Sequence, residues 1–410
     1  MEFRDYQKEI IKKGVNIINK YSFLYLAMQV RTGKTLTSLG IAEAMGCRNL
    51  LFITKKKAIS SIEDDVSKLC PSYVTFIRNY ESLHKLPDKV QFDFIIVDEA
   101  HSIGAYPKPS GRSKKVAELI RKHRPLVILM SGTPTPESYS QMYHQVYGIL
   151  KNPFKNFRNF YRFADVYVNK KQRVINGRTI NNYDDGKMDI VNKMKPYTIN
   201  YTQQEAGFDS SVEEEVLWVR PNPIVEEYVK ELKKDLVITI DDKYVLADTP
   251  VKLMQKTHQL CSGTVKFEDK SATVIDTFKA QFIKDYFKGK KIGIFYKFKA
   301  ELDALKTVFG DNLCTEIHEF DNTDKNIALQ IVSGREGTKL SKAKFLVFYN
   351  IDFSATSYWQ ARDRMTTKDR KHNKIYWIFS IGGIEKDIYK SVTNKKDYTL
   401  KHFRRDFLDL

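Results

Sequence analysis

Short apolar runs alternate with amphipathic stretches through the first 150 residues. These runs are nearly continuous in apolar residues, and each is followed by a helix-like segment or a turn; they cover residues 50–53, 74–77, 94–97 and 126–130. Strands that are buried on both faces have this pattern, because helices cover both sides of a parallel sheet. The pattern therefore predicts an α/β domain built on a parallel sheet.

A second pattern of the same kind begins near residue 275, with apolar runs at 292–295, 345–349 and 375–379. Between the two patterns lies a basic, aromatic stretch that suits a helical insertion. We therefore predict an α/β fold with two parallel-sheet lobes and a mostly helical basic insertion between them. The predicted boundaries are 1–150 for lobe 1, 151–215 for the insertion and 216–410 for lobe 2.

The chain is strongly basic, with 68 Lys and Arg against 50 Asp and Glu and a formal net charge of +18. Such a balance favours a polyanionic partner, and nucleic acid first. The alternative is a lysine-rich surface in a chain of biased composition. The four cysteines contain no Cys-x-x-Cys pair, which favours reduced thiols in the cytoplasm over a zinc site. No apolar run approaches 18 residues, so we expect no membrane span.

The tripeptide Gly33-Lys34-Thr35 lies after the apolar run 23–27 and before the helix-like stretch 36–45. A strand, loop and helix in this order direct backbone N–H groups and a helix N-terminus at phosphate. Lys34 would neutralise the β- and γ-phosphates of ATP, and Thr35 would offer its hydroxyl to Mg²⁺. The full phosphate-loop pattern has a glycine where this chain has Met28, and Arg31 stands where a glycine is common, so an ordinary helix start is the alternative.

The tetrapeptide Asp98-Glu99-Ala100-His101 follows directly after the apolar run 94–97. Asp98 at the end of a strand would hold the same Mg²⁺ through its water shell, and Glu99 would orient the attacking water. The alternative is a strand end followed by a helix with acidic residues in its first turn. Together with the glycine-lysine-threonine loop, the motif indicates an ATPase that uses ATP and Mg²⁺.

Six segments of the chain form an ordered series: Tyr6-Gln7, Arg31-Thr32-Gly33-Lys34-Thr35, Asp98-Glu99-Ala100-His101, Ser131-Gly132-Thr133-Pro134, Gln360 and Arg364. The series resembles the motifs of superfamily 2 helicases and translocases. The resemblance is closest to the Snf2-like branch, and especially to compact members encoded by bacteriophages.

The resemblance implies a motor of two RecA-like lobes, with ATP between them and nucleic acid across them. It implies nucleotide contacts for Tyr6, Gln7 and residues 31–35, with Gln7 reading the adenine edge through its amide. Gln360 and Arg364 are four residues apart on a helix and share a face, and Arg364 would be the arginine finger. His101, Ser131 and Thr133 would relay lobe closure to the nucleic acid.

The resemblance has one departure, because the family pattern has a second arginine where this chain has Thr367. Arg362 and Arg370 are the nearby alternatives for that role.

Two groups of basic residues are candidates for nucleic-acid contacts. Lys55, Lys56 and Lys57 follow the run 50–53 at the position where the family touches a phosphate backbone. Lys55 and Lys56 are the candidates for that contact, and the rest of the run would be solvated charge. Arg158 and Arg162 lie among aromatic residues in the stretch 154–173, which would either supply a stacking wedge or form the core of a small helical subdomain. In both cases the arginines would face the duplex.

The sequence thus predicts an ATP-driven DNA motor that acts on forked or branched duplex DNA by unwinding or branch migration. One alternative is a duplex translocase that displaces proteins without separating strands. The other is a nucleotide-dependent DNA-binding switch with little turnover. Replication or recombination proteins of a phage or its host are the expected partners, and a bacterial host cytoplasm is the expected location if the chain is phage-encoded.

Overall fold

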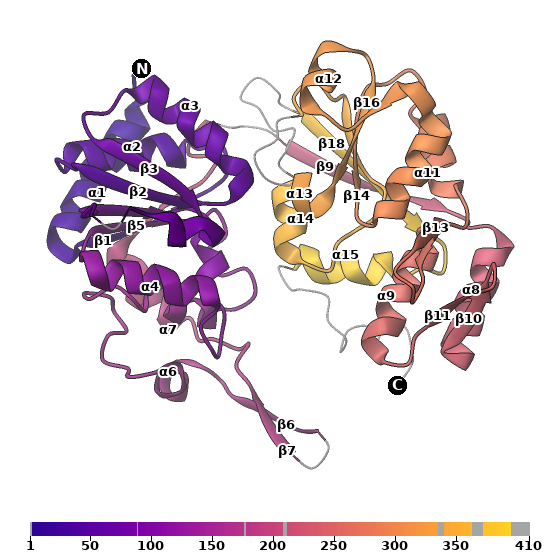
Figure 1. Cartoon of the computed structure of the whole chain (residues 1–410), viewed down its shortest axis with the longest axis horizontal. Helices are drawn as coiled ribbons and strands as arrows, with labels where there is room; N and C mark the ends of the chain where they lie inside the picture. Colours follow the sequence, from indigo (N-terminus) through magenta and orange to yellow (C-terminus); the bar gives the residue numbers. More distant parts are fainter. Residues whose placement is uncertain are drawn as a thin grey trace. The chain divides into compact units, whose positions relative to one another are not determined.

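The structure is a computed structural model that describes residues 2–87, 89–175, 178–207, 211–334, 340–362 and 372–394. The chain divides into two compact units, Met1–Phe208 and Asp209–Leu410 (Figure 1). Each unit holds a six-stranded sheet whose neighbouring strands all pair in parallel. The predicted α/β fold with two parallel sheets is confirmed.

The sheet of the first unit has the strand order β3-β2-β4-β5-β1-β8. Five of its strands lie where the apolar runs predicted them: β1 (Phe23–Met28), β2 (Asn49–Thr54), β3 (Val74–Asn79), β4 (Phe94–Val97) and β5 (Leu126–Met130). The sixth, β8 (Thr198–Tyr201), pairs with β1 at the edge of the sheet and was not predicted, because it is short and half polar.

Helices cover both faces of this sheet, as the continuous apolar strands require. Alternate strand residues point into two separate clusters, so that Leu51 packs on one side and Leu50 on the other. One side carries α1 (Asp5–Tyr21), α2 (Lys34–Ala44) and α3 (Ile59–Leu69). The other carries α4 (Gly111–His123), α5 (Met142–Val146), α6 (Phe160–Tyr167) and α7 (Asp189–Met194).

The stretch after residue 150 belongs largely to the first unit. Besides α6 and α7 it contains a hairpin of β6 (Lys171–Ile175) and β7 (Arg178–Asn182), which extends away from the rest of the unit (Figure 1). Its aromatic side chains Phe154, Phe160 and Phe163 are buried in the same cluster as strand residues of the sheet. These aromatic residues therefore form core, which is one of the two roles the sequence allowed.

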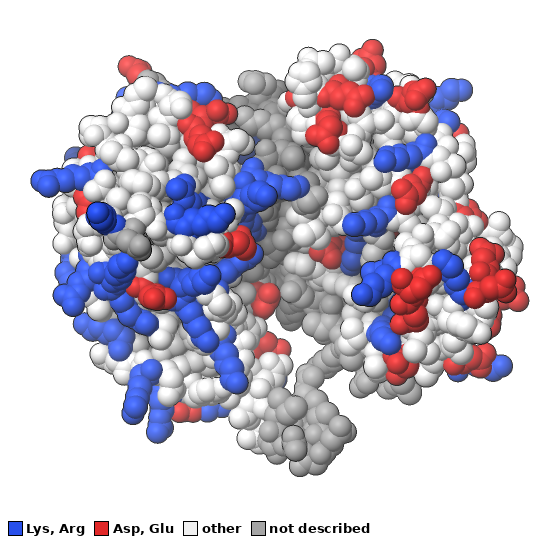
Figure 2. All heavy atoms as spheres, in the orientation of Figure 1, with Lys and Arg blue, Asp and Glu red and all other residues white. Residues whose placement is uncertain are grey.

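Positive charge is concentrated in one part of the first unit. Residues 101–200 contain 18 Lys and Arg against 6 Asp and Glu, which gives +12 of the chain's net +18. The outer face of α4 contributes the exposed cations Lys114, Lys115, Arg121 and Lys122, while Val116 and Ile120 on its inner face are buried. Figure 2 shows Lys and Arg side chains gathered over this face of the unit.

The sheet of the second unit has the order β15-β16-β14-β17-β18-β9. The runs predicted at 292–295, 345–349 and 375–379 correspond to β14 (Ile292–Tyr296), β17 (Phe345–Phe348) and β18 (His372–Ser380). The strands β9 (Ser211–Val219), β15 (Leu313–Cys314) and β16 (Asn326–Gln330) were not predicted. Two small hairpins join β10 (Val237–Ile240) to β11 (Lys243–Leu246) and β12 (Thr264–Lys266) to β13 (Ala272–Val274).

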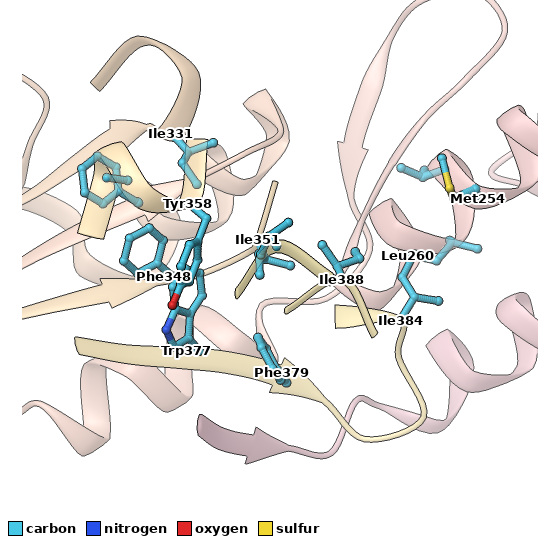
Figure 3. Close-up of a cluster of buried hydrophobic side chains, with 14 of the residues drawn as sticks. Met254, Leu260, Ile331, Phe348, Ile351, Tyr358, Trp377, Phe379, Ile384 and Ile388 are labelled. Atoms are coloured by element: carbon cyan, nitrogen blue, oxygen red, sulfur yellow. The ribbon is translucent and has the colours of Figure 1, made fainter. Parts of the chain in front are cut away.

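The described helices of the second unit are α8 (Pro223–Asp235), α9 (Pro250–Cys261), α10 (Phe278–Tyr286), α11 (Lys299–Phe309), α12 (Ile317–Asn322), α13 (Ile331–Gly334), α14 (Ala355–Arg362) and α15 (Glu385–Thr393). Aromatic stacking fixes α14 on the sheet. The centroid of the Trp377 ring lies 3.9 Å from that of the Phe348 ring and 5.3 Å from that of the Tyr358 ring (Figure 3). Among the described residues, no helix is both long and apolar enough to cross a membrane.

Candidate active site

The phosphate-binding loop predicted from the sequence connects β1 to α2. Gly33 caps the N-terminus of α2 with a φ of 80°, in the left-handed region that favours glycine. Lys34 and Thr35 form the first turn of the helix, where free N–H groups attract anions. The Lys34 Nζ donates a long hydrogen bond of 3.4 Å to the Gln29 carbonyl. A phosphate group could replace that contact at little cost.

The two departures of the loop from the glycine-rich pattern have different structural explanations. Met28 is fully buried and is the last residue of β1, so the position of the missing glycine belongs to the strand. Arg31 has a φ of 64°, which a side chain with a Cβ disfavours. The loop thus adopts a glycine-like conformation at Arg31 without a glycine.

Tyr6 and Gln7 lie against the phosphate loop. The Tyr6 hydroxyl donates to the Thr32 carbonyl at 3.1 Å. Gln7 is buried, and its Nε2 donates to the Gly33 carbonyl and to Thr37 Oγ1, both at 3.3 Å. Its Oε1 accepts from the Arg4 backbone N–H at 3.0 Å. Reading of an adenine edge by Gln7 would therefore exchange some of these bonds for bonds to the base.

Asp98 follows β4 and is held by the neighbouring strand β2. Thr54 Oγ1 donates to Asp98 Oδ2 at 2.9 Å, and the Tyr80 hydroxyl donates to the Asp98 carbonyl. Burial, and then the adjacent charge of Glu99, raises the pKa of Asp98 to about 6, although the Lys34 ammonium opposes this. A carboxylate in this environment gains from a cation placed next to it.

Glu99 and His101 form the second half of the acidic motif. Glu99 has a φ of 49°, at the sharp turn between β4 and the following 3₁₀ turn. His101 Nδ1 lies 3.2 Å from Glu99 Oε2 and 2.9 Å from Ser131 Oγ. The Thr133 backbone N–H donates to the same Ser131 oxygen at 3.1 Å. The residues predicted to couple the site, His101, Ser131 and Thr133, therefore form one chain of polar contacts that ends at Glu99.

Sheet topology explains why these motifs meet. β4, β5 and β1 are adjacent in that order, so the carboxyl ends of three parallel strands carry the acidic motif, the Ser131 loop and the phosphate loop. A Cβ on Gly132 would lie 3.5 Å from both the Met28 carbonyl oxygen and the Val30 nitrogen, so the Ser131 loop touches the phosphate loop. Active sites of open parallel sheets form at this edge.

The donor chemistry fits a magnesium–nucleotide complex. Hydroxyl and carboxylate oxygens, here those of Thr35 and Asp98, are hard ligands of the kind Mg²⁺ prefers. Within the residues that the structure describes, no group of three or more His, Cys, Asp or Glu side chains forms a metal cage. Mg²⁺ typically binds through one or two protein oxygens together with substrate phosphates and water, which is what this edge offers.

The basic candidates of the first unit lie on its surface. Lys55 precedes the short 3₁₀ turn after β2 and is half-buried, and Lys56 is exposed. Arg158 is exposed just before α6, and Arg162 is exposed within it, where its Nη1 lies 3.9 Å from Asp165. All four are accessible to a phosphate backbone, but only the lysines lie at the edge that carries the nucleotide motifs.

Several expectations for the second unit fall outside the described residues. Gln360 belongs to α14, but its side chain is not described, and Arg364, Thr367 and Arg370 lie beyond the described range. Arg362 is described, and its Nε lies 2.6 Å from Glu214 Oε1 within the second unit. Arg362 therefore has an anionic partner within its own unit, and its role as a second arginine finger stays a prediction.

Sequence reasoning missed two groups of polar residues. Glu214 on β9 accepts hydrogen bonds from the hydroxyls of Tyr358 and Tyr389 and from Trp377 Nε1 at 2.8, 3.0 and 2.9 Å, and so anchors α14. Gln203 after β8 contacts the phosphate loop from 174 positions away in the chain. Neither residue belongs to a recognisable motif, so only the fold reveals them.

A protein-family comparison matches residues 26–278, more than half of the chain, to the SNF2-related domain. The chain belongs to the SNF2-related family. This confirms the predicted Snf2-like branch of helicase superfamily 2 and the prediction of an ATP hydrolase of that superfamily. It does not bear on the expectation of a bacteriophage source.

Individual SNF2-related proteins are similar to parts or most of the chain. A Caenorhabditis elegans homologue of the SWI/SNF-related, matrix-associated, actin-dependent regulator of chromatin subfamily A-like protein 1 is 32% identical over 125 residues. That match covers 30% of this chain and only 16% of the relative.

Two solved structures are similar over nearly the whole chain. The Sulfolobus solfataricus SWI2/SNF2 ATPase core in complex with dsDNA has a TM-score of 0.44 and 14% identity. That match covers 96% of this chain and 91% of the chain of the solved structure. The SWI2/SNF2 ATPase core domain of the same organism has a TM-score of 0.43 and 17% identity. That match covers 100% of this chain and 90% of the chain of the solved structure.

Proposed function

We propose that this SNF2-related protein is an ATP-driven motor on duplex DNA and that forked or branched duplex DNA is its substrate. The observation that carries the proposal is the meeting of Lys34, Asp98 and Glu99 at the carboxyl edge of one parallel sheet. Membership of the SNF2-related family supports a translocase, and the relative of known structure described with dsDNA is consistent with a duplex partner.

The residues of the first unit would act in sequence on a bound nucleotide. MgATP, when bound, supplies the phosphoanhydride bond whose hydrolysis drives the cycle. Lys34 would neutralise phosphate charge, while Thr35 and Asp98 would hold the metal ion. Glu99, whose Oε2 lies 3.2 Å from His101 Nδ1, would position the attacking water and accept its proton.

Coupling to DNA would run through the loop after β5. Ser131 contacts His101 and is fixed by the Thr133 N–H, so a shift of this loop would move the imidazole beside Glu99. From the second unit, Gln360 and Arg364 would complete the site, with Arg364 stabilising charge on the transferring phosphoryl group. This role rests on the family resemblance.

The charge distribution supports a polyanionic partner for the first unit. The +12 net charge of residues 101–200 includes the exposed face of α4 and the arginines Arg158 and Arg162. Lys55 and Lys56 add cations at the edge that carries the nucleotide motifs. Contacts of this kind bind phosphates without reading sequence, as a motor that moves along DNA requires.

The experiment that tests the proposal compares ATP hydrolysis with single-stranded, duplex, forked and four-way DNA. The proposal expects duplex-containing DNA to stimulate hydrolysis, with forked or four-way DNA the best substrates. Equal stimulation by plain duplex would favour a translocase that displaces proteins without separating strands, and a forked-duplex unwinding assay would separate the two. Nucleotide-dependent DNA binding without turnover would favour the switch.

A further inference from the structure

The last segment of the first unit holds the phosphate loop through three hydrogen bonds. The Gln29 N–H donates to the Tyr201 carbonyl at 2.9 Å, which extends the pairing of β1 with β8 into the loop. The Gln203 N–H donates to Gln29 Oε1 at 2.8 Å, and Gln203 Nε2 donates to the Val30 carbonyl at 3.0 Å. Two consecutive residues of the loop are thus fixed by Tyr201 and Gln203.

A second support reaches the same loop from α1. The Tyr6 hydroxyl donates to the Thr32 carbonyl, and the Tyr6 ring stacks on that of Tyr201 with centroids 4.9 Å apart and planes 17° apart. Tyr201 therefore contacts the loop through its backbone carbonyl, and it contacts Tyr6 through its ring. Residues 6, 201 and 203 form a brace around residues 29–32.

The conformation of the loop explains why it needs this brace. Phosphate binding requires backbone N–H groups that already point at the ligand, and glycine-rich loops reach such conformations without strain. Here Arg31 has a positive φ of 64°, a conformation that a side chain disfavours unless its surroundings hold it. Gln203 fixes the Val30 carbonyl, which belongs to the peptide group that leads into Arg31.

The turn that carries Gln203 is itself well ordered by hydrogen bonds. The Thr202 N–H and hydroxyl both donate to Glu205 Oε2, at 2.6 and 2.8 Å, and the Tyr201 hydroxyl donates to the Glu205 carbonyl at 2.9 Å. The first unit ends shortly afterwards at Phe208, and the chain continues into the second unit. The brace is therefore also the segment through which the first unit leads to the second.

We propose that Gln203 is a positioning residue for ATP, which holds the phosphate loop in its binding conformation and links the occupancy of the loop to the segment 201–207. The inference rests on the proposed function, because it takes the loop to be the ATP site. Gln203 acts through the backbone of Val30 and through Gln29, so its effect falls on nucleotide affinity and on the order of its own segment.

The test compares Gln203→Ala and Gln203→Glu with Gln204→Ala. Gln203→Glu keeps the size of the side chain but removes the donor to Val30, and Gln204 is the exposed neighbour, which serves as the control. Affinity is measured by titration with a fluorescent ADP derivative, and KM and kcat for ATP are measured with duplex DNA. Because one side-chain hydrogen bond is lost, we expect affinity to fall roughly three- to tenfold in both Gln203 variants and KM to rise by a similar factor.

Three further readouts separate positioning from a general structural role. The melting temperature and nucleotide-free DNA binding of Gln203→Ala should match those of Gln204→Ala. ADP should slow hydrogen exchange of residues 201–207 in the parent protein, and this protection should be lost in Gln203→Ala. Equal nucleotide affinity in Gln203→Ala and Gln204→Ala, a large fall in melting temperature, or exchange unaffected by ADP in the parent would each overturn the inference.

Lys34→Ala, measured in the same assays, distinguishes failure of the Gln203 inference from failure of the proposed function. If Lys34→Ala stops hydrolysis while Gln203→Ala is silent, the loop is the ATP site and only the inference fails. If Lys34→Ala hydrolyses ATP like the parent, the proposed function fails and the inference fails with it.

Discussion

The Nδ1 of His101 lies 3.2 Å from the Oε2 of Glu99, and the same nitrogen lies 2.9 Å from Ser131 Oγ. A single imidazole thus connects the predicted catalytic carboxylate to the loop after β5. Since an imidazole nitrogen carries at most one proton, the contacts to Glu99 and Ser131 depend on each other. A change in the Ser131 loop would therefore alter how Glu99 is held.

The first prediction concerns this connection. His101→Ala should retain nucleotide binding and most of the hydrolysis seen without DNA. Its DNA-stimulated rate should fall about tenfold, which corresponds to about one hydrogen bond. Rates with and without duplex DNA provide the measurement, and His84→Ala, at an exposed histidine of the same unit, is the control. An equal loss in both rates would assign His101 to the chemistry instead of to coupling.

The second prediction concerns pH. Because the pKa of Asp98 is raised to about 6, its carboxylate is protonated in an increasing fraction of the nucleotide-free enzyme as pH falls through that value. Metal binding needs the ionised form, so kcat/KM for MgATP should fall on the acid side with a midpoint near the pKa of Asp98. A profile that is flat down to pH 5 would show that Asp98 is not required in ionised form.

The raised pKa of Asp98 also has a consequence for stability. The pKa of the Asp98 carboxyl is 3.8 in the unfolded chain and about 6 in the folded protein. Its protonation therefore stabilises the fold fully at pH values below 3.8, and this contribution is lost as the pH rises through about 6. Asp98→Asn should therefore raise the free energy of unfolding at pH 8 by up to about 3 kcal/mol while it removes hydrolysis. Thermal melting of the variant and the parent at pH 8 and at pH 5 measures this, and the difference should shrink at pH 5.

The third prediction concerns the basic face of α4. The affinity for duplex DNA should fall as the salt concentration rises. The slope of log K against log salt concentration should be about −0.9 for each phosphate that the protein neutralises. The double variant Lys114→Glu with Lys122→Glu should bind duplex DNA more weakly and with a shallower slope. Lys230→Glu with Lys234→Glu on α8 makes the same change of charge in the second unit and is the matched control. Equal losses in the two double variants would reduce the effect to net charge.

The fourth prediction concerns Arg364, whose role follows from the family resemblance. Arg364→Ala should bind ATP and DNA but lose on the order of 10²–10³ in turnover, as the loss of a transition-state donor does. Arg362→Ala is the contrasting variant, because Arg362 pairs with Glu214 at 2.6 Å. It should lower the melting temperature and change kcat little. If both variants lose turnover equally, neither residue can be singled out as the arginine finger.

Much of the fold could be predicted because its central strands are buried on both faces. β1, β2, β4 and β5 are nearly continuous apolar runs of strand length, as parallel strands covered on both faces require. β8 and β9 escaped prediction for the opposite reason, since an edge strand with polar residues resembles a loop. β9 contains three successive glutamates, and only the fold reveals that Glu214 turns inward to three aromatic side chains.

The site divides in the same way. Lys34, Asp98 and Glu99 could be predicted because phosphate and metal chemistry requires these residue types next to a strand end. Gln203 could not, because a glutamine 173 positions away from Val30 gives no local signal. Its importance depends on the pairing of β8 with β1, which no motif encodes.

We propose that the phosphate loop and the acidic motif hydrolyse ATP under the control of duplex DNA. Steady-state ATP hydrolysis by the parent protein, Lys34→Ala and Glu99→Gln, with and without duplex DNA, tests this directly. We predict that DNA stimulates the parent, that both variants lose nearly all hydrolysis, and that Glu99→Gln still binds ATP. Hydrolysis by Lys34→Ala within about threefold of the parent, or a parent rate that DNA does not change, would contradict the account.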